Sequence, residues 1–309
     1  MKTLEGLEAL TPPRAGSAVA VGTFDGVHVG HRAVITRAVE DARAQGIASA
    51  VLTWDRHPAA TLRPGSEPPL LTSAERKAEL VGDLGADLLV VLAFDAALAR
   101  WPAERFATDV LARGLGARSV WVGRGWRFGH RAAGDVALLE RLGERLGFAA
   151  HGVDLAEVAG GPASSSRARA AVAGGDLGLA RALLGRPFDL DGTVVRGEGR
   201  GRSLGYPTAN LRVDPALLRP ARGIYAGEGL MGGRRHKAAV SVGVNPTFGG
   251  EESSATRIEA YLMGLDEDLY GQRIRIAFLR RLRDERKFDS LTALTEQMAT
   301  DVRQAEAST

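Results

Sequence analysis

Hydrophobic and polar residues alternate in two different ways along the chain, and the change falls near residue 184. From Ser17 to about Asp154, short apolar runs rich in β-branched residues are separated by stretches with helical spacing. The expected strands are AVAVGTF, ASAVLTW, DLLVVLAF, RSVWVG and FAAHGVDL, with helices from about Gly30, from Ser73, near Ala103 and near Asp135. This order predicts an α/β domain with a Rossmann-like parallel sheet, because each crossover must return over the sheet.

A helical stretch from Ser164 to Leu184 leads into a region with a different pattern. The segments DGTVVRG, GIYAGEGLM, HKAAVSVGV, TRIEAYLMG and QRIRIAFLR are strand-like and are separated by Gly-rich turns. They predict a mainly antiparallel β-barrel. A C-terminal helix is expected from Ser290 to Gln304, with a stripe of apolar residues that we expect to pack mostly into a core: Leu291, Leu294 and Met298. Two domains are therefore expected, residues 1–184 and 185–309.

Composition narrows the class of protein. A chain of 309 residues is long enough for two ordinary domains. It has no cysteine, which excludes disulfides, zinc-thiolate sites and cysteine nucleophiles. The net charge is +3, and acidic and basic residues are evenly mixed in both halves, although only four of the 40 cationic residues are lysine. We expect no nucleic-acid partner.

Targeting signals are not apparent in the sequence. The start MKTLEGLEAL lacks the features of a secretory signal, and no apolar run approaches the roughly 20 residues of a membrane span. We therefore expect a cytoplasmic protein with no membrane partner. The oligomeric state is left open, including a weak homo-oligomer.

The segment GTFDGVHVGH, Gly22 to His31, lies where the first strand turns into the first helix. Glycines at this point let the backbone approach a phosphate, and the helix N-terminus attracts negative charge. His28 and His31 are three apart and share one face of the first helical turn. Such a site suits attack of an ionised phosphate on a nucleotide, which requires charge stabilisation rather than a strong base. The G-x-G-x-x-G fingerprint is absent, which disfavours nicotinamide cofactors.

A second Gly-rich turn, GRGRSLGYPTANL, spans Gly199 to Leu211 and precedes a strand. Its backbone N–H groups can surround phosphates. The side chains of Thr208 and Asn210 offer oxygen ligands for a hard cation such as Mg²⁺.

These segments resemble the bacterial bifunctional riboflavin kinase/FMN adenylyltransferase family, also called FAD synthetase, over nearly the whole chain from Val19 to about Asp301. In the first half the matching motifs are GTFDGVHVGH, TWDRHP, WVGRGWRFGHRAAGD and SSSRAR. In the second half they are GRSLGYPTAN, GIYAG, GVNPTFGG, DLYGQ and LRDERKF, in the family's order.

The resemblance implies two reactions. Riboflavin and ATP give FMN, and then FMN and ATP give FAD and pyrophosphate, both with Mg²⁺. Two alternatives stay open. Gly125 stands where the family usually has Asp or Asn and is followed by Trp126 in place of Phe, so the chain could be a riboflavin kinase whose N-terminal domain has altered specificity or only binds flavin. The third alternative is a flavin-binding regulatory or carrier protein without catalysis.

The resemblance also assigns roles to residues. The catalytic residues are Glu259, which takes a proton from the un-ionised riboflavin hydroxyl, and His28 and His31. The nucleotide-binding residues are Gly22, Phe24, Asp25, Gly30, Ser164, Ser165, Ser166, Arg169, Gly201, Ser203 and Gly205. The flavin-binding residues are Pro58, Gly125, Trp126, Phe128 and Arg283, and the metal ligands are Thr208 and Asn210. Asp284 and Glu285 are expected to be solvated charges.

Overall fold

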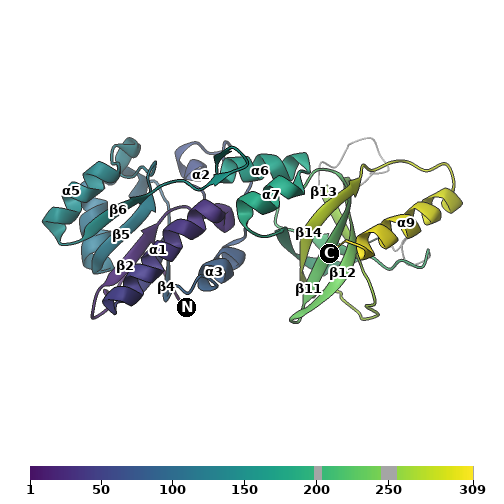
Figure 1. The fold of residues 1–309 in the computed structure, drawn as a ribbon, viewed down its shortest axis with the longest axis horizontal. Coiled ribbons are helices and arrows are strands. Elements are labelled where there is room, and N and C mark those ends of the chain that lie inside the picture. The colour runs from purple at the N-terminus through teal and green to yellow at the C-terminus, as the bar shows by residue number, and fades with distance from the viewer. Residues whose placement is uncertain (198–203, 245–255, 309) are drawn as a thin grey trace. The chain divides into compact units, whose positions relative to one another are not determined.

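The chain packs into two compact units, Met1–Ser165 and Ser166–Thr309 (Figure 1). A computed structural model describes residues 1–197, 204–244 and 256–308. The expected domain boundary between residues 184 and 185 stays a prediction, and the helices just before it belong to the second unit.

The first unit contains one sheet of six parallel strands in the order β1, β4, β3, β2, β5, β6. Their bounds are Lys2–Glu5 (β1), Ser17–Val21 (β2), Ala48–Trp54 (β3), Leu88–Leu92 (β4), Ala117–Gly123 (β5) and Ala149–Val153 (β6). The predicted Rossmann-like sheet is confirmed. Strand β1 was not expected, because four residues are too few to show an alternating pattern and the strand exists only through its pairing with β4.

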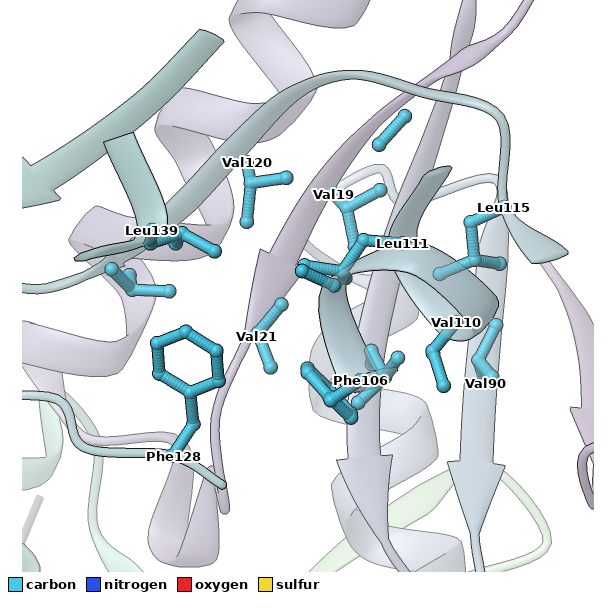
Figure 2. Packing of buried hydrophobic residues seen from close by; sticks show 14 of the residues in the cluster. Val19, Val21, Val90, Phe106, Val110, Leu111, Leu115, Val120, Phe128 and Leu139 are labelled. Atoms are coloured by element: carbon cyan, nitrogen blue, oxygen red, sulfur yellow. The ribbon is translucent and has the colours of Figure 1, made fainter. Parts of the chain in front are cut away.

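Helices cover both faces of this sheet. One face packs against α1 (Val29–Gln45) and α3 (Ala74–Gly82), and the other packs against α4 (Ala103–Arg105), which runs on into the π-helical stretch η3 (Phe106–Gly114), and α5 (Val136–Leu146). Figure 2 shows the second layer, where Phe106 and Leu111 of η3 meet Val19 and Val21 of β2. Shorter elements are η1 (Asp25–Val27), α2 (Pro58–Leu62), η2 (Leu98–Arg100), η4 (His130–Ala132), β7 (Glu157–Val158) and β8 (Gly161–Pro162).

The strand order places a topological switch between β2 and β5. The chain runs outward from β2 through β3 to β4, and then crosses back to β5 and β6. Ligands of open α/β sheets bind at such a point, beyond the carboxyl ends of the strands. The segment from Gly22 to His31 follows β2, and the segment containing Trp126 follows β5, so both motifs lie at this edge.

The second unit is built on a closed barrel of six antiparallel strands in the order β10, β13, β12, β11, β14, β9. Their bounds are Phe188–Val195 (β9), Ala209–Arg212 (β10), Gly223–Met231 (β11), Arg234–Val244 (β12), Thr256–Leu262 (β13) and Arg273–Arg283 (β14). The barrel interior is filled by large buried side chains, among them Phe188, Tyr225 and Phe278. The predicted antiparallel barrel is confirmed. It is preceded by α6 (Ser165–Gly174) and α7 (Leu177–Leu184).

The C-terminal helix α9 (Leu291–Glu306) packs against the outside of the barrel, mainly on β11 and β12 (Figure 1). Its N-cap is Ser290, whose side chain accepts a hydrogen bond from the Ala293 N–H at 3.1 Å. The expectation that its apolar stripe packs mostly into a core is wrong. Leu294 and Met298 line a cavity against the barrel, and Leu291 is 69% exposed.

Candidate active sites

The turn between β2 and α1 has an unusual backbone. Phe24, Gly26 and Val27 all lie in the left-handed region, with φ of 50°, 80° and 40°. For Val27 this is a strained conformation, because its branched side chain crowds the backbone there. Such strain persists only where the surrounding structure holds the turn in place.

Asp25 provides part of that hold. The residue is only 2% exposed, and its Oδ1 accepts a hydrogen bond from the Leu71 N–H at 2.9 Å. The Gly26 N–H next to it donates to Oγ1 of Thr72 at 3.2 Å. The carboxylate expected to serve the nucleotide is thus directed at the chain segment before α3.

His28 and His31 lie together at the start of α1, as expected. Nδ1 of His28 accepts from the N–H groups of Gly30 and His31 at 3.1 and 3.3 Å, so this residue is the N-cap of the helix. The two imidazole rings are stacked with their centroids 3.6 Å apart. An Nδ1 that accepts a hydrogen bond carries no proton, so His28 donates through Nε2.

The SSSRAR segment meets this turn through its second serine. Oγ of Ser165 donates to the Asp25 carbonyl at 3.0 Å. A Cβ at Gly30 would lie only 3.1 Å from His28 Cε1, so a glycine suits the close approach of the imidazole ring. The remaining predicted nucleotide-binding residues are placed as follows: Gly22 directly after β2, Phe24 with its ring centroid 5.3 Å from that of His31, Ser164 just before α6, and Ser166 and Arg169 on α6 in the second unit.

An aromatic cavity of about 300 Å³ lies beside the carboxyl ends of β3 and β5. Trp126 and Phe128 stack in its wall with ring centroids 4.7 Å apart and nearly parallel planes. Its lining includes Thr23, Trp54, Pro58, Phe94, Trp101, Phe106, Trp126, Arg127, Phe128 and Arg131. Three of the predicted flavin-binding residues are thus brought together, and Trp101 and Phe106 join them from segments with no motif. Such walls bind a planar aromatic ring by stacking.

Gly125 is not part of this lining. The residue is exposed, and a Cβ added there would meet no atom within 4 Å. The structure therefore provides room for a side chain at the position where the resemblance expects one.

A smaller cavity of about 50 Å³ adjoins the aromatic one and shares Thr23 and Trp54 with it. Lys77 of α3 reaches into it, and its Nζ donates to the Thr23 carbonyl at 3.1 Å and to Thr53 Oγ1 at 3.4 Å. Burial lowers the pKa of Lys77, against the opposite effect of Asp25 and Asp55. Sequence reasoning missed this residue. The only sequence feature that could have indicated Lys77 is composition, because nearly all cationic residues of the chain are arginine and this one is a lysine.

The site in the second unit is a cavity of about 270 Å³ between the outer face of the barrel and α9. One continuous row of cross-strand partners runs through it: Asn210, Glu259, Ser241, Ile224 and Arg283 on β10, β13, β12, β11 and β14. Directly paired residues of antiparallel strands project from the same face. The neighbours Ile258 and Ala260 are buried in the barrel, so Glu259 faces outward toward α9.

Glu259, Thr208 and Asn210 are brought together as expected. Glu259 and Thr208 both line the cavity, and Asn210 is the direct strand partner of Glu259. The Glu259 carboxylate forms an ion pair with Arg257, two residues away on β13. Among the other predicted residues, Gly205 lies in the turn before β10 with a φ of 83°, whereas Gly201 and Ser203 lie outside the described residues.

Arg283 lines the cavity, but its guanidinium is engaged with α9. Its Nε and Nη2 donate to the Asp301 carboxylate at 2.9 and 2.6 Å, and Asp301 is only 4% exposed. Its Nη1 donates to the Asp284 carbonyl at 2.8 Å. Arg283 therefore attaches α9 to the barrel and forms part of the cavity wall.

Glu285 is exposed, as expected for a solvated charge, but it also contributes to the cavity. It lines the same cavity as Glu259, and its Oε1 lies where a side chain at Gly243 would begin. Although much of the side chain is exposed, partial burial raises the pKa of the Glu285 carboxyl, and the nearby Glu259 raises it further against the effect of three arginines. The cavity thus has a second glutamate beside Glu259, and Asp301 of α9 also lines it.

A Rossmann-like unit with paired histidines at its switch point, joined to a barrel with a carboxylate beside oxygen ligands, defines a two-domain enzyme of nucleotide and phosphoryl transfer. The family models agree. The FAD synthetase model matches residues 11–167, and the riboflavin kinase model matches residues 184–309. The chain belongs to the bifunctional riboflavin kinase/FMN adenylyltransferase family.

Relatives match over almost their whole length. The bifunctional riboflavin kinase/FMN adenylyltransferase of Pseudomonas fluorescens is 34% identical over 99% of this chain and 97% of its own. That of Escherichia coli K12 is 32% identical over 97% of this chain and 96% of its own.

A crystal structure described as a macrolide-efflux protein from Streptococcus pneumoniae has a TM-score of 0.88 and 29% identity, with both chains fully covered. We do not transfer the efflux activity in that description, because both family models and the bifunctional relatives agree on flavin chemistry. Within the described part of the chain, no helix has the length and apolar character needed to span a membrane.

Proposed function

We propose that this chain converts riboflavin to FMN in its second unit and FMN to FAD in its first, using ATP for both steps. The observation that supports this most directly is that each unit has its own cavity, one walled by stacked aromatic rings and the other by Glu259 and its strand partners. Because the FAD synthetase model matches the first half of the chain and the riboflavin kinase model the second, we assign FAD formation to the first cavity and FMN formation to the second.

In the first unit a phosphate oxygen of FMN attacks the α-phosphorus of ATP. A new P–O bond forms at the α-phosphorus, the bond from the α-phosphorus to the oxygen that bridges to the β-phosphate breaks, and pyrophosphate leaves. The attacking oxygen is already ionised, so the protein must stabilise charge rather than remove a proton. Nε2–H of His28 and the N-terminal N–H groups of α1 are the donors suited to this, and the aromatic cavity suits the flavin ring.

In the second unit the 5′-hydroxyl of riboflavin attacks the γ-phosphorus of ATP, and ADP leaves. The hydroxyl must lose its proton as it attacks, and Glu259 is placed to accept it. Arg257 holds the carboxylate in position through their ion pair.

The oxygen ligands near Glu259 are of the kind that Mg²⁺ prefers. Thr208 offers a hydroxyl and Asn210 an amide oxygen, both hard ligands, and they would hold the ion together with nucleotide oxygens and water. When bound, the ion neutralises charge on the phosphates.

The cytoplasmic location and the weak homo-oligomer stay predictions.

The test is to incubate the purified chain with riboflavin, ATP and Mg²⁺ and to separate the flavins by chromatography. We expect FMN first and FAD later. FMN without FAD favours a kinase whose first unit only binds flavin or acts on another substrate, and unchanged riboflavin favours the non-catalytic carrier.

His28 variants separate the capping role from the chemical role. Replacing His28 by alanine removes the N-cap and should destabilise the first unit by about 0.5–2 kcal/mol, whereas asparagine keeps an acceptor and restores most of that loss. Both variants lack Nε2–H and should form FAD from FMN about 10²-fold more slowly. FMN formation in the same samples is the control. All four tryptophans lie in the first unit, so their fluorescence reports its unfolding. Full FAD synthesis by His28→Asn would contradict the chemical role.

Gly125 tests the flavin pocket. Its backbone is not left-handed and the space beside it is open, so Gly125→Asn should fit without strain. A new hydrogen bond to the flavin is expected to lower the KM for FMN about two- to tenfold. Gly125→Ala is the matched control, because it restricts the unfolded backbone in the same way but brings no donor or acceptor. An equal KM for the two variants would show that the flavin ring is out of reach of this position.

A further inference from the structure

The strained turn before His28 is held in part by the stretch Leu71–Lys77, which leads into α3. Leu71 and Thr72 bind the Asp25 carboxylate through their N–H groups, and Thr72 Oγ1 accepts from Gly26. Lys77 adds a bond to the Thr23 carbonyl at the beginning of the turn. The conformation that presents His28 therefore depends on side chains outside the motif itself.

The Thr23 carbonyl lies at the beginning of the turn and accepts two of the hydrogen bonds that hold it. It accepts hydrogen bonds from Thr53 Oγ1 at 2.9 Å and from Lys77 Nζ at 3.1 Å, which links the ends of β2 and β3 to α3. The amine also contacts Thr53 Oγ1 at 3.4 Å. A lysine ammonium has three donors, and the nearby carboxylates of Asp25 and Asp55 favour its charge.

We propose that Lys77 is a positioning residue of the adenylyl-transfer site, which fixes the Thr23 carbonyl and thereby the placement of His28. The inference rests on the proposed function of the first unit. Thr23 lines both the small cavity and the aromatic cavity, so a shift of its carbonyl changes the wall between the flavin pocket and the histidine turn. Replacing Lys77 by a side chain of similar length without donors would fill the same space, but the Thr23 carbonyl would keep only the hydrogen bond from Thr53.

The variant to make is Lys77→Met. Turnover of FMN to FAD should fall by roughly 10- to 100-fold, because small displacements of catalytic groups have effects of this order. The KM for FMN should change much less than turnover, since Thr23 is only one part of the cavity wall and the stacked rings are not touched. Riboflavin phosphorylation by the same sample is the internal control. Lys2→Met is the matched control, because Lys2 is an exposed lysine of the same unit.

A double-mutant cycle with His28→Asn distinguishes positioning from a general loss of stability. If Lys77 acts through His28, adding Lys77→Met to His28→Asn should lower the remaining turnover far less than it does in the wild type. Independent, multiplying losses would overturn the inference, and so would unchanged turnover in Lys77→Met.

If the wild type makes no FAD, that result counts against the proposed function and not against the role of Lys77. A spectroscopic measurement then still tests that role. With ¹⁵N-labelled histidine, the His28 ring signals, identified by their loss in His28→Asn, should shift in Lys77→Met and stay unchanged in Lys2→Met. Identical spectra would overturn the inference. Should Lys77→Met fail to fold, Thr53→Val removes the other donor to Thr23 and must show the same effects.

Discussion

Replacing Glu259 by glutamine is expected to lower the rate of FMN formation by about 10²- to 10⁴-fold, the usual range for loss of a general base. Glutamine keeps the size of the side chain and its place in the cross-strand row, but it cannot take the proton of the riboflavin hydroxyl. The measurement is the initial rate with riboflavin and ATP. FAD formation from added FMN should continue, because it takes place in the first unit.

Glu285→Gln is the matched control for this experiment. Both carboxylates line the cavity, and the Glu285 carboxyl has the raised pKa. We expect Glu285→Gln to keep most of the kinase activity. If Glu285→Gln abolishes FMN formation while Glu259→Gln retains it, the base is Glu285 and our assignment is wrong.

Replacing Asp301 by alanine is expected to destabilise the second unit by about 3–5 kcal/mol, because it leaves the Arg283 guanidinium without its buried carboxylate. The KM for riboflavin should rise as well, since α9 forms one wall of the cavity and this ion pair attaches it to β14. Calorimetry or circular dichroism should follow this transition, because the tryptophans of the chain report only the first unit.

Two further variants test the reason for this loss. The double variant Arg283→Met with Asp301→Leu removes both charges and should recover most of the stability, since no unpaired charge is left. Asp289→Ala removes an exposed acid just before α9 and should have little effect on stability. A small loss in Asp301→Ala itself would mean that the apolar contacts of α9 hold the helix without the ion pair.

Local patterns were enough to predict most elements. The strand GIYAGEGLM agrees with β11 at both ends, and the helix starts expected at Ser73 and Asp135 agree with the N-caps of α3 and α5. These signals are local because strand alternation and capping depend on residues within a few positions of one another. The motif around His28 was identified for the same reason.

Partnerships between distant residues were decided by the tertiary structure. The ion pair of Arg283 with Asp301 appears only when α9 packs on the barrel, and the exposed Glu285 lines the same cavity as Glu259 only through the fold. Lys77 had no motif at all, and its bond to Thr23 spans 54 positions. The sequence by itself determined the order of elements, the two kinds of sheet and the family, since these follow from periodicity and short motifs. Only folding decided which charges meet, because burial and pairing depend on groups that are far apart along the chain.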